Sequence, residues 1–363
     1  MTQSFQELTR SYAEAQGARC AWFLRAQNVA EAIAKLGLIG PGDRLVMRAT
    51  DATDEFCARF GARSLSFAAD LTPEAYVAAT NAHAHPASQR FVEGHASYAD
   101  GAGASFDQLY WFVESIGCRG LRVPDIRVLA EAARRVGAIL LVDNTVPSSW
   151  GCHPLELGAH IALEALDRVA GGSLNAPVVG IAVARDLRGR GKKAQPDDAA
   201  RKAYRLLAQR LGGEMSHAVP DIDECDVAAI ADGLSSLAER MQRHADHARV
   251  VAEYLAANPV VGFVGYPGLK SHPDFDVAAR TLMHGFGPAV DFELPDCARA
   301  GAFMAACSCS NRTHPAGGRL TRLSPLCGDE SHYIRLFAGL DDPLDIVDSL
   351  EQALRLFCNP PHA

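Results

Sequence analysis

The sequence predicts an α/β protein, with a large domain built around a mostly parallel sheet and a smaller α+β domain after it. Strand-like and helical patterns alternate over the first half of the chain, as in domains with a parallel sheet. Residues 138–142 (Ala-Ile-Leu-Leu-Val) are almost continuously apolar, which is typical of a central strand covered on both faces. Beyond residue 256 short strands alternate with helices. We therefore predict a large domain over 1–240 and a small domain over 241–363.

The N-terminal region is predicted to mix helices with short strands. Its apolar residues recur at helical spacing, but Gly17 and a strand-like run interrupt them. Further on, a segment rich in Ala, His and Gly shows little periodicity. The predicted elements are an interrupted helical stretch (4–36), a strand (20–24), a turn (40–43), a second strand (44–47) and a loop (78–104).

The middle of the chain carries the clearest alternation of strands and helices. Asp125–Val136 is amphipathic, with apolar residues on one helical face, and Gly137 ends the helix. Strands are predicted around it at 109–114, 138–142, 160–166 and 178–184. Strand–helix–strand order is what a parallel sheet requires.

The C-terminal part begins with a long predicted helix, which runs from Asp226 through His244 to about Ala256. The pattern after it is that of a small α+β domain. Strands are predicted at 262–265, 289–294 and 333–337, and helices at 298–306 and 343–357.

Composition limits the classes of partner. The 363 residues carry a formal net charge of −8, which argues against a general binder of nucleic acid or anionic membrane. No apolar run reaches the roughly 18–20 residues needed to cross a bilayer. The N-terminal segment 1–18 lacks the apolar core of a signal peptide, so we expect a cytoplasmic protein. The basic stretch 185–210 is interpreted as a solvated loop leading into an exposed helix.

The ten cysteines are scattered through a large chain, so no disulfide framework is predicted. Cys307 and Cys309, with His314 nearby, resemble part of a metal site. Zinc sites built by proteins usually have four ligands or three plus water, and no fourth ligand stands near these residues. We predict no metal site.

Asp143 is the most informative single residue. It ends the apolar strand 138–142, and ligands of open α/β sheets bind beyond the carboxyl ends of strands. Its carboxylate is therefore expected to reach a cleft. The alternative is that Asp143 only starts a turn with Asn144 and Thr145, and the aspartate alone does not decide between them.

Many spaced motifs resemble the Cys/Met-metabolism family of pyridoxal-phosphate enzymes, which includes cystathionine synthases and lyases, methionine lyases and homocysteine-forming sulfhydrylases. The resemblance covers nearly the whole chain. In the large domain and the interdomain helix the matching segments are Asp125–Gly137, Val142–Thr145, Pro154–Ala159, Gly171-Gly172 and Gly233–His244. In the small domain they are Tyr266–Pro273, Gly285–Gly287, Phe292–Leu294 and Arg335–Asp342.

The resemblance implies the fold of the aspartate-aminotransferase-like (fold-type-I) transferases, and dimers or tetramers whose active sites are shared between subunits. It also implies pyridoxal phosphate as cofactor. Two functions of that site match residues here. Asp143 matches the aspartate that holds the pyridine nitrogen, and Arg335, with Ser308, matches the substrate-binding positions.

The Schiff-base lysine of the family has no match. Its Ser-x-Thr-Lys segment falls on Ala165–Arg168, so Arg168 stands at the lysine position, and both phosphate-binding hydroxyls are replaced, by Ala165 and Asp167. Arginine stays protonated and cannot form the aldimine. Other cofactor-contacting segments of the family fall on Arg25-Ala26-Gln27 for the Ser-Gly-Met turn, Thr50 or Asp51 for the ring-stacking tyrosine, and Cys118-Arg119-Gly120 for Asn-Pro-Thr.

No lysine elsewhere in the chain replaces the missing Schiff-base lysine of the family. The five lysines are Lys35, Lys192, Lys193, Lys202 and Lys270, and none follows a strand at the right point. The arm with a Tyr-Ser-Arg motif, which in the family precedes the segment matching 8–17, has no counterpart either. We expect Arg168 to pair with Asp143 or Asp167, because a buried carboxylate needs a cation.

Three functions remain open at this point. The first is a pseudoenzyme of the family that does no Schiff-base chemistry and serves as an oligomer partner, in a homo-oligomer or with an active relative. The second is a retained C–S lyase or transferase of Cys/Met metabolism that binds pyridoxal phosphate. The third is a binding protein for an amino acid or another small carboxylate, which uses the old cleft.

Overall fold

The computed structural model describes residues 5–49, 53–61, 64–82, 108–168, 170, 177–184, 205, 222–309 and 316–358. It confirms the predicted α/β class. The strands of the large sheet are β1 (Ala18–Arg25), β2 (Arg44–Arg48), β3 (Leu65–Ala68), β4 (Leu109–Glu114), β5 (Ile139–Asp143), β6 (Ile161–Ala165) and β7 (Val178–Ala184). The helices of this part are α1 (Phe5–Ala15), α2 (Val29–Lys35), α3 (Thr53–Phe60), α4 (Pro73–Asn81), α5 (Ile126–Val136) and α6 (Ser148–Gly151).

The large sheet has the strand order β1-β7-β6-β5-β4-β2-β3. From β6 to β3 all neighbours pair in parallel, whereas β7 is antiparallel to both β6 and β1. A mostly parallel sheet was predicted, and this is confirmed. Because β4, β5 and β6 run in parallel, their carboxyl ends meet at one edge of the sheet.

Both faces of the large sheet are buried, as the continuous apolar strands require. Alternate residues of β4 and β5 enter two different hydrophobic clusters. Trp111 and Leu140 lie in the cluster that also takes residues from α1, α4, α5 and α8, while Tyr110 and Leu141 lie in the cluster with α2 and α3. The central strands are thus held from above and below.

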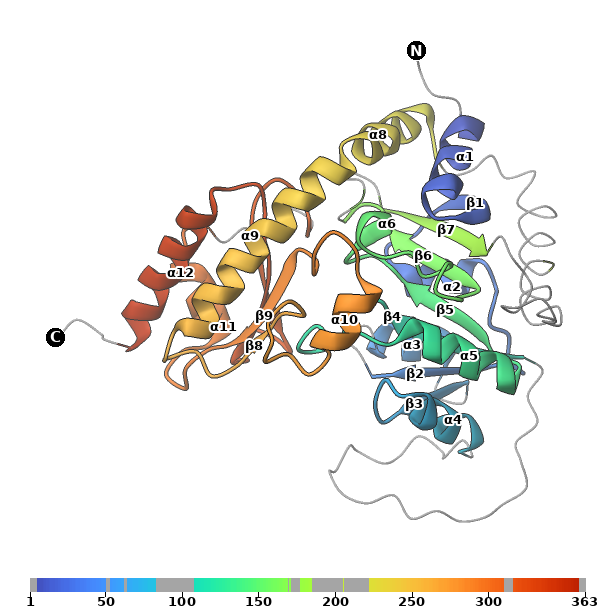
Figure 1. The fold of residues 1–363 in the computed structure, drawn as a ribbon, viewed down its shortest axis with the longest axis horizontal. Coiled ribbons are helices and arrows are strands. Elements are labelled where there is room, and N and C mark those ends of the chain that lie inside the picture. The colour runs from blue at the N-terminus through green and yellow to red at the C-terminus, as the bar shows by residue number, and fades with distance from the viewer. Residues whose placement is uncertain are drawn as a thin grey trace.

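The C-terminal part has its own core and its own antiparallel sheet, in the order β10-β11-β9-β8. Helix α9 runs obliquely from the large sheet to this smaller sheet, and α12 packs along it on the outside (Figure 1). The elements are α8 (Glu224–Ser235), α9 (Leu237–Ala257), β8 (Val264–Gly265), α10 (Phe275–Thr281), β9 (Ala289–Glu293), α11 (Ala300–Ala306), β10 (Arg322–Leu326), β11 (Tyr333–Phe337) and α12 (Pro343–Cys358).

The predicted single helix from Asp226 to Ala256 is two helices in the structure. They meet at Ser236, whose hydroxyl donates to the carbonyls of Asp232 and Gly233 and so competes with the regular helix pattern. The predicted domain boundary at 240/241 falls within α9.

Several elements were missed. The segments of α3, β3, α10 and β10 show no clear hydrophobic period. Helix α4 ends in the start of the segment predicted as a loop, most of which lies outside the described residues. Within the described residues, no helix is long and apolar enough to cross a membrane.

His244 connects α9 to the smaller sheet. Its ring is fully buried, and Nδ1 lies 2.8 Å from the carbonyl oxygen of Ala338. Nε2 is buried without a hydrogen-bond partner among the described residues. Burial lowers the pKa of His244 to about 4, because the charged ring would lose its hydration.

Replacing His244 with Asn tests this buried ring. Since the native pKa lies below the ordinary 6.5, unfolding takes up a proton between these values, and stability is lost as pH falls from about 6.5 towards 4. His244→Asn keeps a donor for the Ala338 carbonyl but does not titrate. Urea unfolding at a series of pH values should give a shallower loss of stability below pH 6.5 for the variant. An unchanged slope would contradict the buried, neutral ring.

Candidate functional site

A cavity of about 240 Å³ lies where the carboxyl ends of β4, β5 and β6 meet the smaller sheet. Each of the three strands ends on a lining residue: Glu114, Asp143 and Ala165. This is the position at which ligands bind to open α/β sheets. The other lining residues are Asn28, Val29, Thr145, Val146 and Arg168 from the large domain, and Ala316, Arg322, Ser324 and Phe337 from the C-terminal part.

Both sequence-based interpretations of Asp143 hold in the structure, since it starts a turn and also faces the cavity. Its Oδ1 accepts hydrogen bonds from the main-chain nitrogen of Thr145 (2.9 Å) and from the Thr145 hydroxyl (2.5 Å), so it does start a turn. The same side chain lines the cavity. Burial raises the pKa of Asp143, while the Thr145 hydrogen bonds and the charge of Arg168 oppose that rise. The carboxylate is thus fixed in orientation.

Arg168 lies on the turn that follows β6 and lines the cavity. Its Nε is 3.5 Å from Oδ2 of Asp167, so the expected pairing occurs with Asp167. The positive charge of Arg168 also acts on Asp143, where it opposes the rise in pKa that burial causes. Asp167 keeps a second oxygen, Oδ1, that is buried without a hydrogen-bond partner among the described residues, and burial raises its pKa.

Arg322 and Ser324 line the cavity from β10, and neither was selected from the sequence. Arg322 Nε donates to Ser324 Oγ at 3.0 Å, which orients the guanidinium group. Burial lowers the pKa of Arg322, and the charge of Arg168 lowers it further. Two arginines therefore line the cavity, and the charge of Arg168 acts on Arg322.

Arg335 is held in a salt bridge and does not line this cavity. Its Nε and Nη2 donate to the two oxygens of Asp291 at 2.7 and 2.9 Å, and Nη2 also donates to the carbonyl of Cys118 at 2.8 Å. Asp291 is only 1% exposed. The two residues face each other directly in the register of β9 and β11. The contact occupies the Nε–Nη2 edge of the guanidinium group, an edge that can bind a carboxylate through two hydrogen bonds.

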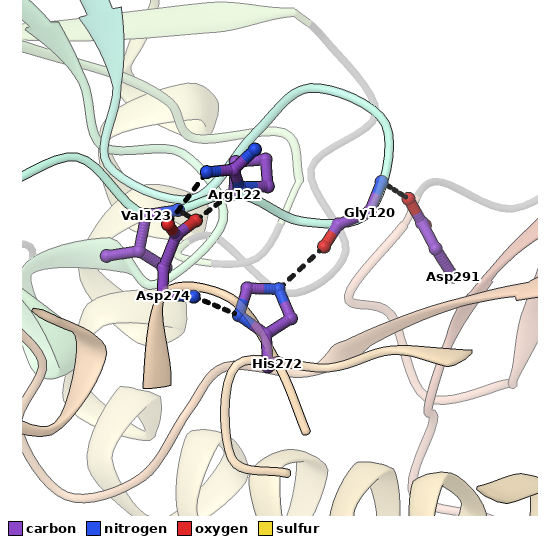
Figure 2. A network of polar contacts seen from close by, with 6 residues as sticks. All are labelled: Gly120, Arg122, Val123, His272, Asp274 and Asp291. Carbon is purple, nitrogen blue, oxygen red and sulfur yellow. Dashed lines mark hydrogen bonds and ion pairs between the residues drawn. The ribbon is translucent and has the colours of Figure 1, made fainter. Parts of the chain in front are cut away.

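The same carboxylate anchors the loop after β4. The main-chain nitrogen of Gly120 donates to Asp291 Oδ2 at 2.8 Å, and His272 Nε2 lies 2.8 Å from the Gly120 carbonyl oxygen (Figure 2). His272 Nδ1 accepts from the main-chain nitrogen of Asp274, so Nε2 carries the proton. Asp274 in turn accepts from Arg122 and from the Val123 nitrogen (Figure 2). Asp291 and His272, both from the C-terminal part, thus bind the main-chain N–H and C=O groups of Gly120 in this loop.

Most of the other predicted site residues do not line the cavity. Arg25 pairs with Asp226, Ala26 is buried, and the Gln27 nitrogen donates to Glu31. Asn28, the N-cap of α2, and Val29 take the cavity positions instead. Ser308 bonds to Ser349 away from the cavity. Ala165 does line it. Thr50 and Asp51 lie outside the described residues.

The Cys307–Cys309 pair does not gather ligands in the described residues. No group of three or more His, Cys, Asp or Glu residues suited to a metal ion occurs among them, and His314 lies outside them.

Glu164 was not selected from the sequence either. It precedes Ala165 in β6, so its side chain points to the opposite face of the sheet. There its Oε2 accepts from the Tyr12 hydroxyl (2.8 Å) and from Gln16 Nε2 (2.7 Å). Burial raises the pKa of Glu164 to about 7, and the negative charge of Asp143 adds to that rise. The two carboxyl groups are thus electrostatically coupled through β6 and β5.

With this geometry established, comparison with known proteins gives the family. The model of the Cys/Met metabolism PLP-dependent enzymes matches residues 107–324, more than half of the chain. The chain belongs to this family. The matched residues run from the start of β4 into β10 and include every charged residue that lines the cavity. The expected resemblance and the pyridoxal-phosphate enzyme fold are thereby confirmed.

The individual relatives that the chain matches agree with this family assignment. The cystathionine gamma-synthase of Mycobacterium bovis is 34% identical over 250 residues, which cover 64% of this chain and 58% of the relative. The L-methionine gamma-lyase of Pseudomonas putida is 32% identical over 67% of this chain and 61% of its own length. The chain thus spans about three fifths of the curated relatives it matches. An apo methionine gamma-lyase from Micromonospora echinospora superposes with a TM-score of 0.74 at 27% identity, over 96% of this chain and 84% of that one.

The Asp291–Arg335 pair can be tested by removing one partner. Asp291→Ala leaves a largely buried guanidinium group without its carboxylate, so the free energy of unfolding should fall by about 3–5 kcal/mol. The double variant Asp291→Leu, Arg335→Met should recover most of that loss. Urea unfolding measures both. As a control, Glu351→Ala removes an exposed pair with Arg355 and should change stability by less than about 1 kcal/mol. An effect of Asp291→Ala no larger than this control would contradict the pair.

Glu164→Gln tests the buried carboxyl. The native pKa of about 7 lies above the ordinary 4.5, so stability is present below pH 4.5 and is lost as pH rises through 7. Gln has the same shape and no charge, so the variant should gain stability over the parent as pH rises from 5 to 8, by up to about 3 kcal/mol. Glu156→Gln, at an exposed carboxylate, serves as the control. Unfolding curves at both pH values decide, and an equal difference at pH 5 and 8 would refute the assignment.

Proposed function

We propose that this protein is a member of the Cys/Met metabolism family that forms no Schiff base, with the catalytic lysine replaced by Arg168. The observation that carries this proposal is the place of Arg168. It lines the cavity at the strand ends beside Asp143, where the family resemblance puts the reactive amine. A guanidinium group remains protonated at any working pH and is not an amine nucleophile.

The residues at the cavity fit pyridoxal phosphate only in part. In such enzymes this cofactor supplies an electron-accepting ring. Asp143 suits a protonated ring nitrogen. The described residues that line the cavity include no lysine, and Ala165 offers no hydroxyl to a phosphate. Asp167, next to Arg168 in the chain but not in the cavity lining, has an oxygen that is buried without a hydrogen-bond partner among the described residues. These residues do not fit a covalently held cofactor.

The state of Arg335 supports the same proposal. An arginine that receives a substrate carboxylate must be able to exchange partners, but Arg335 already has a buried carboxylate, Asp291, in bidentate contact. Asp291 also holds the Gly120 nitrogen. Releasing Arg335 to a ligand would leave Asp291 buried without its cation, which is strongly unfavourable.

We further propose that the protein acts as an oligomer partner, as a homo-oligomer or together with an active relative. Family resemblance supports an oligomer. Light scattering of the purified protein gives its size, and mass spectrometry of co-purifying chains identifies a lysine-bearing relative. A monomer alone would count against this part of the proposal.

The absence of Schiff-base chemistry is tested by an absorbance spectrum with added pyridoxal phosphate, before and after borohydride reduction. We expect no stable aldimine band and no pyridoxyl mass on a lysine. Exposed Lys270 and Lys35 react adventitiously in such experiments, so the Lys35→Arg, Lys270→Arg variant is the control. A stable aldimine band in this variant, with one pyridoxyl group per chain on a single lysine, would refute the proposal and favour a retained C–S lyase or transferase.

A further inference from the structure

A buried cluster of polar side chains lies behind the cavity wall, on the opposite face of β6. Tyr12, Gln16 and Glu164 form it, and each is no more than 1% exposed. Glu164 Oε2 accepts hydrogen bonds from the Tyr12 hydroxyl (2.8 Å) and from Gln16 Nε2 (2.7 Å), and Gln16 Nε2 also donates to the Tyr12 oxygen at 3.1 Å. Gly180 of β7 stands opposite Glu164 and leaves room for the Tyr12 ring, because a Cβ atom there would lie 2.6 Å from the Tyr12 hydroxyl oxygen. Both side-chain donors that reach the carboxyl group therefore bind the same oxygen.

Two oxygens of this cluster have no donor. Glu164 Oε1 and Gln16 Oε1 are both buried without a hydrogen-bond partner among the described residues. Buried acceptors in this state are unfavourable. The two side chains are already joined by the bond from Gln16 Nε2 to Glu164 Oε2, so each unpartnered oxygen shares a carbon atom with one end of that bond. One proton on Glu164 Oε1 gives the Gln16 oxygen a donor, and the amide and the carboxylic acid then exchange two hydrogen bonds.

The groups that act most strongly on the charge of Glu164 include no cation among the described residues. Helix α1 contributes Tyr12 and Gln16, α6 contributes the main-chain N–H of Ser149, and β5 contributes the negatively charged Asp143. Burial raises the pKa of Glu164 to about 7, the three donors oppose that rise, and Asp143 adds to it. The geometry and the charges thus both favour a neutral carboxylic acid at neutral pH.

The cavity and this cluster share β5 and β6. Ala165, the residue after Glu164, lines the cavity, and so does Asp143 of β5. Thr145 joins these two lining residues, since its hydroxyl donates to Asp143 Oδ1 at 2.5 Å and accepts from the Ala165 nitrogen at 2.9 Å. Glu164 thus lies one residue from the cavity wall, and the charge of Asp143 favours a proton on it. A positive group that meets Asp143 in the cavity offsets that charge and weakens the binding of the proton to Glu164.

We propose that Glu164 is a proton-binding site linked to the cavity, with its proton on Oε1 and the O–H donating to Gln16 Oε1. When a positively charged group of a ligand meets Asp143, Glu164 releases this proton to solvent. The resulting carboxylate is held by the donors of Tyr12, Gln16 and Ser149. Because binding releases a proton, a cationic ligand group binds more tightly as pH rises through neutrality. The inference goes beyond the proposed function, since it does not depend on whether a Schiff base forms.

Infrared difference spectroscopy of the full chain, with carbon-13-labelled glutamate, detects the proton directly. We expect a protonated-carboxyl band at pH 6 that is largely lost by pH 8, with a midpoint near 7, and that is missing from Glu164→Gln. Glu156→Gln, which removes an exposed carboxylate, is the matched control and should keep the band. A parent protein without the band at pH 6, or a band that survives in Glu164→Gln, would overturn the proposal.

The link to the cavity is tested at Asp143. Asp143→Asn removes the charge and keeps an oxygen for the Thr145 donors, so the midpoint of the Glu164 band should move to lower pH. Asp348→Asn, at an exposed aspartate of α12, is the matched control and should leave the midpoint unchanged. Equal midpoints in these two variants would overturn the link.

Tyr12→Phe keeps the proposal testable if melting curves show that Asp143→Asn does not fold. Loss of the hydroxyl removes a donor that favours the carboxylate, so the midpoint should move to higher pH. A midpoint that stays in place or falls in Tyr12→Phe would contradict a proton on Glu164 that is controlled by this cluster.

Discussion

The contact between the two domains depends on one buried carboxylate. Asp291 holds Arg335 through both oxygens and the Gly120 nitrogen through one of them. A carboxylate at 1% exposure is tolerable only with such partners. The partners of Asp291 come from β11 and from the loop after β4. Because the carboxylate needs both partners, it also determines how the smaller sheet approaches the large one. Residues of both domains line the cavity, so its shape depends on this arrangement.

Close approach at this contact has a second cause. A Cβ atom on Gly265 of β8 would lie 2.7 Å from the Cα of Gly120, so the strand has no room for a side chain at this position. Gly120 also has a φ of +83°, which other residues rarely adopt. His272 then donates to the Gly120 carbonyl oxygen, so both main-chain polar groups of Gly120 are hydrogen-bonded. Backbone contacts of this kind survive changes in the side chains that perform chemistry.

The sequence predicted the cavity residues at the edge of the large sheet well, and those on the opposite side of the cavity poorly. Strands ending at Glu114 and Asp143 follow from continuous apolar runs, and these ends line the cavity. Arg322 was missed because β10 has no alternating pattern and contains Pro325, which an edge strand accepts but propensity opposes. The role of Asp291 was missed for another reason. Its strand was predicted, but its partner Arg335 is set by the register between β9 and β11, which no local pattern encodes.

The position of Arg335 shows why a matched residue does not carry over its function by itself. The sequence assigns it to a substrate carboxylate, and its place on β11 is unchanged by the ion pair. What decides its state is the residue directly across the sheet, Asp291. An acidic side chain there supplies, within the chain, the carboxylate that a ligand would otherwise bring, and it does so without the loss of translational freedom that binding a ligand entails. A ligand carboxylate would therefore have to displace Asp291 from Arg335 or bind to another cation.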